Sequence, residues 1–302
     1  MTRSSFRSHA KVNLHLQVVG RRPDGYHELR TVFQMIDLHD SVEIVVAERG
    51  EVQLTVDAPG LSSGPDNLAW KAAATFRDRW APGAGIHLRL RKRIPLGAGL
   101  GGGSSNAATV LLGLRALCGR PAEAEELWPV ARELGADVPF FLLGGTALGF
   151  GRGDEAVPLP EPPPTRFWLV LPPVEVPTGP VFRSLGDLTE ATLPPSISAL
   201  VRVPKGRGVQ FDALCGWNDL QGAVFRLHPD IAGIGTILEQ AGATWICLSG
   251  SGSALVARFP GPELAETAAA SLPSGCRLLP VRTVGRRIWR RQWAGWRAGS
   301  GN

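Results

Sequence analysis

Apolar and polar residues alternate along residues 8–18, so that side chains of one kind fall on one face of an extended chain. Because successive side chains of a β-strand point to opposite faces, this period of two predicts a strand with one buried face. The apolar positions are Ala10, Val12, Leu14, Leu16 and Val18, and the polar ones are His9, Lys11, Asn13, His15 and Gln17.

Further periodic segments divide the rest of the chain into a mixture of strands and helices. In the first half, strands are expected at residues 31–38, 42–47, 51–56 and 86–92, and helices at 67–80, 104–117 and 122–134. In the second half, strands are expected at 167–171, 244–248, 254–259 and 277–284, and helices at 179–185, 218–227, 230–241 and 262–271. These elements lack the regular βαβ alternation of a doubly wound sheet, which favours an α+β fold.

A proline-rich segment at residues 157–165 is the best candidate for a domain boundary. Proline fixes φ and lacks a backbone N–H, so a run of prolines resists both a helix and a central strand. We therefore expect two domains, residues 1–156 and 157–284, followed by a basic tail at 285–302 that is rich in arginine and tryptophan. A length of 302 residues fits two domains of ordinary size.

The composition is that of a folded, water-soluble chain, with 44% hydrophobic and 20% charged residues. No apolar run approaches the roughly 18 residues of a membrane span, and the N-terminal residues lack the apolar segment of a signal peptide. We therefore expect a cytoplasmic protein. The four cysteines lie far apart without a C-x-x-C pair, which argues against a disulfide framework and against a structural metal.

The net charge of +5 is concentrated at the C-terminal end. Residues 277–302 contain seven arginines and no acidic residue, so the rest of the chain carries a net charge of −2. Arginines interleaved with Trp289, Trp293 and Trp296 could bind nucleic acid or an anionic membrane. A solvated basic extension is the simpler interpretation and we adopt it, so neither nucleic acid nor a membrane is expected as a partner. The sequence does not define the oligomeric state.

The most informative segment is the glycine-rich run at residues 94–108, IPLGAGLGGGSSNAA, which lies between an expected strand and an expected helix. Glycines remove the Cβ atoms that keep a ligand from the backbone, and the helix N-terminus offers free amides and the positive end of its dipole. The segment therefore predicts an anion site, with phosphate as the favoured ligand. A Walker loop would need Lys where Gly103 stands, a dinucleotide loop lacks its acidic partner about 20 residues on, and the protein-kinase motifs are absent.

The run P-x-G-A-G-L-G-G-G-S-S-N-A-A resembles the phosphate-binding loop of the GHMP kinases, which include galactokinase, homoserine kinase and the mevalonate kinases. Further motifs in order are A-K-V-N-L-H-L, P-D-G-Y-H-E-L, L-G-A-D-V-P-F-F-L, N-D-L and L-S-G-S-G-S. They are similar to those of the branch that phosphorylates a cytidine-diphosphate-linked alcohol in isoprenoid precursor synthesis. The resemblance implies a two-domain kinase with its active site in the cleft between the domains, with another small alcohol as the alternative substrate.

The resemblance also implies an ATP site with Mg²⁺ as the counterion of the nucleotide. The loop would hold the phosphates and Asn67 would lie beside the adenine, although a helix N-cap is an equally physical role for Asn67. No acidic cluster marks a metal ion held by the protein itself. The implied ATP-binding residues are Asn67, Pro95, Gly97, Ala98, Gly99, Leu100, Gly101, Gly102, Gly103, Ser104 and Ser105.

Phosphoryl transfer to an alcohol needs a group that accepts the proton of the hydroxyl. Asp137, in a short loop after Gly135, is one candidate, and a helix N-cap is its alternative role. Lys11 and Asn13 lie about 6.6 Å apart on one face of the first strand, so both could enter one cleft or simply face water. The resemblance assigns the catalytic roles to Lys11 and Asp137, with Lys11 orienting Asp137, and places Asn13 and Asp137 beside the substrate. Since no covalent intermediate on the protein is needed, we expect direct transfer.

Tyr26 and His27 occupy an expected turn, where an aromatic ring and an imidazole suit recognition of a nucleobase. The same pair could instead pack the end of a hairpin. The resemblance implies that both bind the cytosine of the substrate and that Phe182 closes the stack from the other side. A second glycine turn at 249–253 is expected to shape the cleft, with a tight connection between strands as the alternative.

Overall fold

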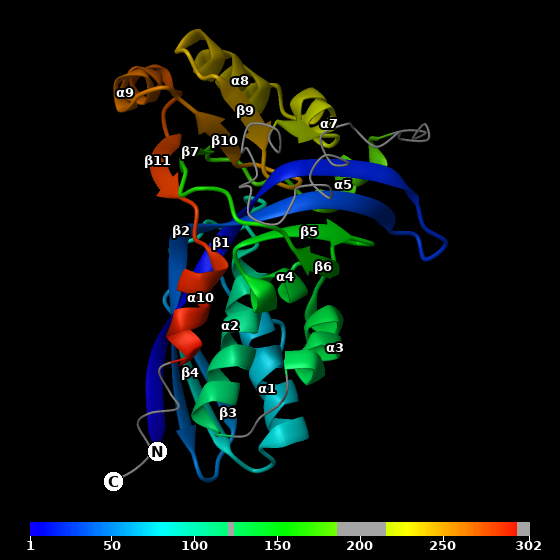
Figure 1. Ribbon diagram of the computed structural model, residues 1–302, viewed down its shortest axis with the longest axis vertical. Coiled ribbons are helices and arrows are strands. Elements are labelled where there is room, and N and C mark those ends of the chain that lie inside the picture. Colours follow the sequence, from blue (N-terminus) through cyan, green and yellow to red (C-terminus); the bar gives the residue numbers. More distant parts are fainter. Residues whose placement is uncertain (120–123, 186–215, 295–302) are drawn as a thin grey trace.

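The computed structural model describes residues 1–119, 124–185 and 216–294, and within them the strands form two sheets (Figure 1). The first sheet has the order β3-β4-β2-β1-β8, with β5 paired to both β2 and β6, and the second has the order β11-β7-β10-β9. The strands of the first sheet are β1 Thr2–Arg21, β2 His27–Ala47, β3 Val52–Val56, β4 Gly85–Arg91, β5 Thr146–Phe150, β6 Glu155–Pro158 and β8 Trp217–Asn218. Those of the second are β7 Arg166–Leu171, β9 Trp245–Leu248, β10 Leu255–Arg258 and β11 Arg277–Arg282.

Helices cover one face of each sheet, which confirms the expected α+β fold. The first sheet packs against α1 Leu68–Trp80, α2 Gly102–Leu117, α3 Ala124–Leu134 and α4 Val138–Leu143. The second sheet is accompanied by α5 Thr178–Arg183, α7 Gln221–Leu227, α8 Pro229–Gln240 and α9 Pro262–Ser271. The last helix of the described residues, α10 Arg286–Ala294, returns to the first sheet. No helix of the described residues is long and apolar enough to cross a membrane.

Three buried apolar clusters hold these layers together. The first lies between the first sheet and helices α1 to α4, and the third lies between the second sheet and its helices. The second joins the two sheets, because Val12 and Leu14 of β1 pack with Phe167 and Leu169 of β7 and with Val256 of β10. Buried side chains from both halves of the chain therefore hold the two sheets in place, and any site between the sheets rests on this packing.

Strand β1 differs from its prediction because both of its faces are buried. The polar face carries Lys11, Asn13 and His15, which are 3%, 2% and 3% exposed. The prediction of one buried face is wrong, because segments distant in the sequence cover the polar face. The alternation of residue types shows only which side chains share a face, not whether that face is covered. Burial lowers the pKa of His15 to about 4, so this imidazole is neutral at pH 7.

The chain passes from the first sheet to the second through the proline-rich segment, between Pro158 at the end of β6 and Arg166 at the start of β7. The later part of the chain still contributes to the first sheet, because Trp217 and Asn218 of β8 pair in parallel with His15 and Leu16. The division into domains 1–156 and 157–284 stays a prediction.

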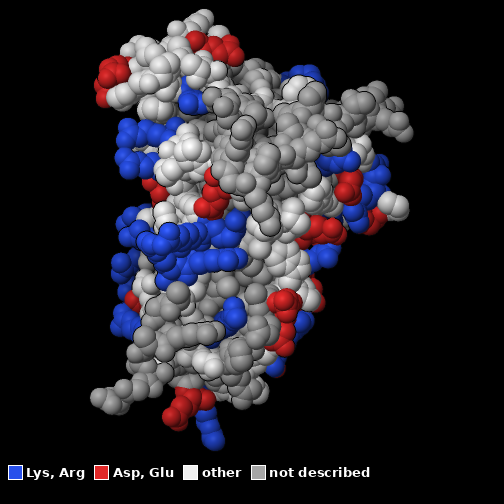
Figure 2. All heavy atoms as spheres, in the orientation of Figure 1, with Lys and Arg blue, Asp and Glu red and all other residues white. Residues whose placement is uncertain are grey.

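Helix α10 packs against the first sheet rather than extending into solvent. Trp289 is 1% exposed within the first core, and the ring of Trp293 stacks on Phe6 with centroids 4.9 Å apart. The prediction of a solvated extension is wrong for residues 286–294, because two tryptophans four positions apart share one helix face and the arginines between them point outward. Figure 2 shows a band of basic side chains over α10. Trp296 lies outside the described residues.

Candidate active site

One cavity of about 1210 Å³ lies where β1, the β1–β2 turn, the glycine loop and the turn after β9 meet. Its walls come from segments far apart in the sequence, including the residues before α4 and the start of α5. Among the residues implied by the resemblance, it is lined by Lys11, Asn13, Tyr26, His27, Gly99, Gly101, Asp137 and Phe182.

A lysine and an aspartate face each other in this cavity. The Nζ of Lys11 lies 3.4 Å from Oδ2 of Asp137 and donates a hydrogen bond to Oδ1 of Asn13 at 2.7 Å. Asp137 stands at the N-cap position of α4, yet its side chain makes no capping hydrogen bond. The Asp137 side chain is 31% exposed while that of Lys11 is 4% exposed, so the carboxylate faces the cavity and the ammonium supports it from the wall.

The orientation of Lys11 is set by a chain of hydrogen bonds along β1 and β2. Asn13 donates through Nδ2 to the hydroxyl of Thr31 at 2.7 Å, and that hydroxyl donates to the carbonyl of His15 at 2.7 Å. The Asn13 amide must therefore present its oxygen to Lys11. Thr31 lines the cavity as well, and a single Thr in an expected strand gave no sign of this role.

Replacement of Lys11 by arginine is expected to reduce turnover by at least about tenfold, although the charge is kept. The site leaves little room: an added Cβ at Gly101 would lie 3.1 Å from Cγ of Lys11, and one at Gly250 would lie 3.4 Å from its Nζ. A planar guanidinium cannot replace a compact ammonium there. Steady-state kinetics of Lys11→Arg would check this, with thermal unfolding to verify the fold. An Arg variant with normal turnover would contradict the assignment of Lys11 to the site.

The glycine loop is held close against β1 and the turn after β9. Gly99 has φ +72°, and a Cβ there would lie only 2.1 Å from the carbonyl oxygen of Ser249. The Ser249 hydroxyl donates to the Gly99 carbonyl at 3.1 Å, and the Lys11 amide donates to the Leu100 carbonyl at 3.0 Å. Helix α2 begins at Gly102, two residues earlier than expected, so its free N-terminal amides belong to the loop itself.

Sequence reasoning missed the carboxylate that anchors both ends of this loop. Asp40 of β2 is fully buried and accepts hydrogen bonds from the amides of Arg93 and Ile94, just before the loop, at 2.6 and 2.8 Å. It also accepts from Nδ2 of Asn106 in α2 at 2.9 Å and pairs with the ammonium of Lys92. Asp40 thus fixes where the loop starts and where its helix begins, and its strand position alone gave no indication of this.

Asp40→Asn is expected to lower the free energy of unfolding by about 3–5 kcal/mol, because it leaves the buried Lys92 ammonium without its counter-charge. Urea unfolding would measure the loss. Asp57→Asn is the matched control, since exposed Asp57 also bonds a backbone amide, that of Lys92, and its loss should amount to less than about 1.5 kcal/mol. Equal effects of the two substitutions would contradict the role of Asp40.

The remaining residues implied for ATP binding lie outside the described lining of this cavity. The Ser105 hydroxyl is buried, donates to the His9 carbonyl at 2.6 Å and accepts from the Ser8 hydroxyl. Asn67 caps α1 by accepting from the Ala69 amide at 2.9 Å. Their contact with the nucleotide stays a prediction, as it does for Pro95, Gly97, Ala98, Leu100, Gly102, Gly103 and Ser104.

Aromatic rings line another part of the cavity. Tyr26 is 56% exposed with the guanidinium of Arg152 5.0 Å from its ring centroid, and His27 stacks on Phe182 with centroids 4.9 Å apart. Partial burial, and then the charge of Arg21, lower the pKa of His27, so its imidazole is neutral at pH 7 and offers one donor and one acceptor. Phe182 thus contacts His27 directly, whereas its predicted place across a base from Tyr26 remains a prediction.

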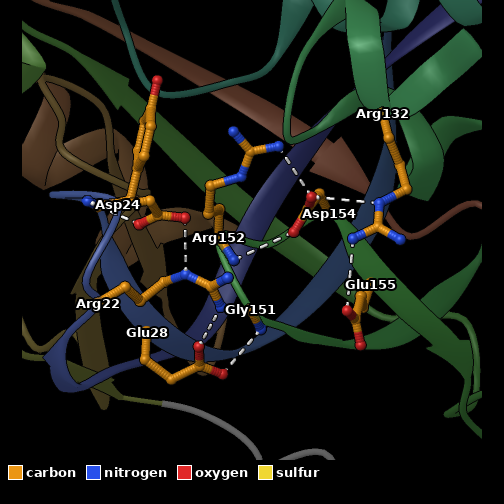
Figure 3. Close-up of polar contacts among 9 residues, drawn as sticks. Arg22, Asp24, Glu28, Arg132, Gly151, Arg152, Asp154 and Glu155 are labelled. Atoms are coloured by element: carbon orange, nitrogen blue, oxygen red, sulfur yellow. Dashed lines mark hydrogen bonds and ion pairs between the residues drawn. The ribbon is translucent and has the colours of Figure 1, made fainter. Parts of the chain in front are cut away.

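A charged network fixes the loop beside Tyr26 (Figure 3). The nearly buried carboxylate of Asp154 accepts from Arg152 at 3.0 Å and from Arg132 at 3.3 Å. Burial alone would raise the pKa of Asp154, but the hydrogen bond and charge of Arg152 outweigh it and the pKa is lowered. On the other side, Glu28 bonds to Arg22 at 2.7 Å and to the Gly151 amide at 3.1 Å. Arg132 and Arg152 line the cavity, and sequence reasoning did not select either of them.

The second glycine turn contributes Gly250 and Ser251 to the cavity and is held by the N-D-L segment. Asn218 donates through Nδ2 to the carbonyls of Leu248 and Gly250, both at 2.8 Å. Gln221 follows N-D-L and accepts from the Leu248 amide at 2.9 Å, so it supports the same turn.

Comparison with known proteins matches residues 67–145 to the GHMP kinases N terminal domain and residues 197–278 to the GHMP kinases C terminal domain. The chain belongs to the GHMP kinase family, which confirms the resemblance found in its sequence. GHMP kinases use ATP as their cosubstrate.

Several curated relatives share one name, 4-diphosphocytidyl-2-C-methyl-D-erythritol kinase. The protein of that name from Solibacter usitatus is 43% identical over 84% of this chain and 80% of its own length. That from Geobacter sp. is 38% identical over 91% of this chain and 97% of its own. A crystal structure of 4-(cytidine 5'-diphospho)-2C-methyl-D-erythritol kinase is 37% identical with a TM-score of 0.73, covering 93% of this chain and all of that one.

More distant members share the fold alone. The homoserine kinase of Cytophaga hutchinsonii is 20% identical with a TM-score of 0.64 and covers 93% of this chain and 99% of its own. The mevalonate kinase of Methanococcus jannaschii is 14% identical with a TM-score of 0.69 and covers 94% of this chain and 99% of its own.

Proposed function

We propose that this chain transfers the γ-phosphoryl group of ATP to the 2-hydroxyl of 4-diphosphocytidyl-2-C-methyl-D-erythritol, a step of isoprenoid precursor synthesis. The observation that carries the proposal is one cavity lined both by the Lys11–Asp137 pair beside the glycine loop and by Tyr26, His27 and Phe182. The shared name of relatives at 37–43% identity supports the choice of substrate.

In the proposed reaction, Asp137 accepts the proton of the attacking hydroxyl as its oxygen bonds to the γ-phosphorus and the bond to the ADP oxygen breaks. Lys11 holds the Asp137 carboxylate in place and stabilises negative charge on the attacking oxygen. The transfer is direct and requires no covalent intermediate on the protein.

The amides of the glycine loop and of the first turn of α2 would bind the phosphates of ATP, because they are free and lie at the positive end of the helix. We expect Mg²⁺ to accompany the nucleotide. Within the described residues, no three His, Cys, Asp or Glu side chains converge on a point that could hold a metal ion. The nucleotide phosphates and water would therefore supply most of its ligands.

At the pyrimidine end of the substrate, neutral His27 can donate to and accept from the base while Tyr26 offers a ring for stacking. Arg132 and Arg152 line the cavity beside these residues and provide positive charge for the diphosphate. This combination favours a nucleoside-diphosphate alcohol over small alcohols without a base or phosphates.

A substrate panel tests the proposal. Purified protein is incubated with ATP and one of four alcohols: 4-diphosphocytidyl-2-C-methyl-D-erythritol, mevalonate, homoserine or galactose. ADP formation is expected with the first alcohol at a kcat/KM at least about 10³-fold higher than with the others. The other three lack the cytidine diphosphate, so the polar groups of the site that would bind it stay unpaired, and a site of this kind strongly rejects such substrates. Preferred turnover of any of the other three would overturn the substrate, and ADP formation unaffected by loss of the Asp137 carboxylate would place catalysis elsewhere.

A further inference from the structure

A second hollow, of about 280 Å³, opens on the first sheet and shares no lining residue with the active-site cavity. No aspartate or glutamate is among the residues that line it. Its volume corresponds to about nine water molecules at roughly 30 Å³ each, which is room for a small hydrated ion. The lining residues are Ser5, Phe6, Arg7, His39, Ser41, Arg91 and Arg93.

Strand register places the polar groups of this hollow in one row. Arg7 of β1 is directly opposite Ser41 of β2, and Ser41 is directly opposite Arg91 of β4. Neighbouring strands lie about 4.8 Å apart, so the serine hydroxyl stands between two guanidinium side chains on one face of the sheet. The Ser5 hydroxyl lies 3.3 Å from that of Ser41 and adds a second donor. We call this row, with Ser5 and Arg93, the Arg7–Arg91 cradle.

Within the described part of the chain, no carboxylate forms an ion pair with the arginines of the cradle. Among the described residues, none accepts a hydrogen bond or forms an ion pair with the side chains of Arg7, Arg91 or Arg93. By contrast, Arg3, four residues before Arg7, pairs with Glu43 at 2.9 Å. Like charges that share one hollow repel one another, and an anion between them removes that repulsion.

The backbone of the cradle is held in place before any ligand arrives. Arg7 lies on a stretch of β1 that has β2 on one side and α10 on the other. The Gln292 side chain accepts from the Arg7 amide at 3.1 Å and donates to its carbonyl at 3.2 Å. Trp293 stacks on the neighbouring Phe6, so the strand is fixed on both sides and binding needs little reorganisation.

The surroundings of the cradle attract anions as well. Helix α10, whose Gln292 bonds to Arg7, carries Arg286, Arg287, Arg290 and Arg291, which line a separate hollow together with Glu161, and Figure 2 shows the basic band over this helix. Such a concentration of one sign of charge raises the local concentration of anions.

We propose that the Arg7–Arg91 cradle is a binding site for a phosphate group, as inorganic phosphate or a small phosphate ester. Guanidinium groups bind phosphate oxygens through paired hydrogen bonds, and the two serine hydroxyls donate to the remaining oxygens. Of the two aromatic rings in the lining, Phe6 is buried and the imidazole of His39 packs against that of His9 with centroids 5.3 Å apart, which disfavours stacking on the bases of a nucleic acid. The lining also lacks an exposed apolar side chain that could enter a lipid layer.

Titration calorimetry with inorganic phosphate tests the site. The titration is done at constant ionic strength with a saturating non-hydrolysable ATP analogue, so that the glycine loop is already occupied. One phosphate is expected to bind to the wild-type protein. Arg7→Ala and Arg91→Ala should each weaken binding by at least about tenfold, as loss of a charge-assisted pair requires.

Arg89→Ala is the matched control. Arg89 lies on β4 like Arg91, and its substitution removes the same charge, but Arg89 does not line the hollow. It should weaken phosphate binding by less than about twofold. No phosphate binding, or equal losses in Arg89→Ala and Arg91→Ala, would overturn the proposal. Single-stranded RNA and phosphatidylglycerol vesicles are titrated in parallel: binding of either without binding of free phosphate would equally overturn it. The outcome is independent of the proposed kinase activity, since no residue of the cradle lines the active-site cavity.

Discussion

Asp137→Asn is expected to lower kcat by at least about 10², with the Kd of the alcohol substrate changed by less than about threefold. The amide keeps the size of the side chain and an oxygen near Lys11, but it cannot accept the proton of the hydroxyl. The interaction with Lys11 at 3.4 Å also loses its charge, so the ammonium no longer has a carboxylate to orient. Steady-state kinetics and calorimetric binding of the substrate would separate the two parameters.

Glu133→Gln is the control for that experiment, because Glu133 also lines the cavity but pairs with Arg79 at 3.0 Å rather than with Lys11. Its kcat should stay within about twofold of wild type, as for a solvent-exposed ion pair. Near-normal turnover of Asp137→Asn would remove Asp137 from the mechanism, and a comparable loss in both variants would point to the general charge of the cavity.

Trp289→Ala is expected to lower the free energy of unfolding by about 3–5 kcal/mol, the range for removal of a large buried aromatic side chain. Trp289 is 1% exposed and packs so closely on Gly144 that a Cβ at that glycine would lie 2.1 Å from the indole ring. The space vacated in the first core cannot be refilled by alanine. Chemical denaturation at equilibrium would measure the change.

Ile288→Ala provides the comparison within the same helix, because Ile288 is 59% exposed and its truncation should change stability by less than about 0.5 kcal/mol. Similar stability of the Trp289→Ala variant and wild type would show that α10 is not part of the core.

Truncation after residue 285 leaves Lys11, Asp137, Tyr26 and His27 in the chain, but it removes Trp289 from the core. If such a truncated protein lost activity, its folding would have to be checked before the loss is assigned to the active site.

The local elements and the glycine loop could be predicted because their signals are local. Periodicity reports which side chains share a face, and a run of glycines before a helix reports a close approach of backbone to ligand. Lys11 and Asp137 became candidates through short motifs, and the structure brings them within 3.4 Å of each other. Lys11 and Asp137 are more than a hundred positions apart in the sequence, so their proximity could not have been predicted without the resemblance to a known family.

The features that could not be predicted depend on contacts between distant segments. Asp40 resembles an ordinary polar residue in a strand, and only the fold brings it to the two ends of the glycine loop. The tryptophans of α10 are separated by arginines, so composition suggested a solvated extension although their spacing places them on one face. Arg7, Ser41 and Arg91 meet only through strand register, which the sequence does not specify.

The packing of α10 also bears on the order in which the protein can fold during synthesis. Strand β1 is translated well before α10, yet the backbone of Arg7 bonds to Gln292 of that helix, and Phe6 packs in a core that includes Trp289 and Trp293. Until these late residues emerge, the nascent chain presents an unpaired strand edge beside an unfilled core, the combination that favours pairing with another chain. Completion of the core around β1 therefore waits until α10 has been translated.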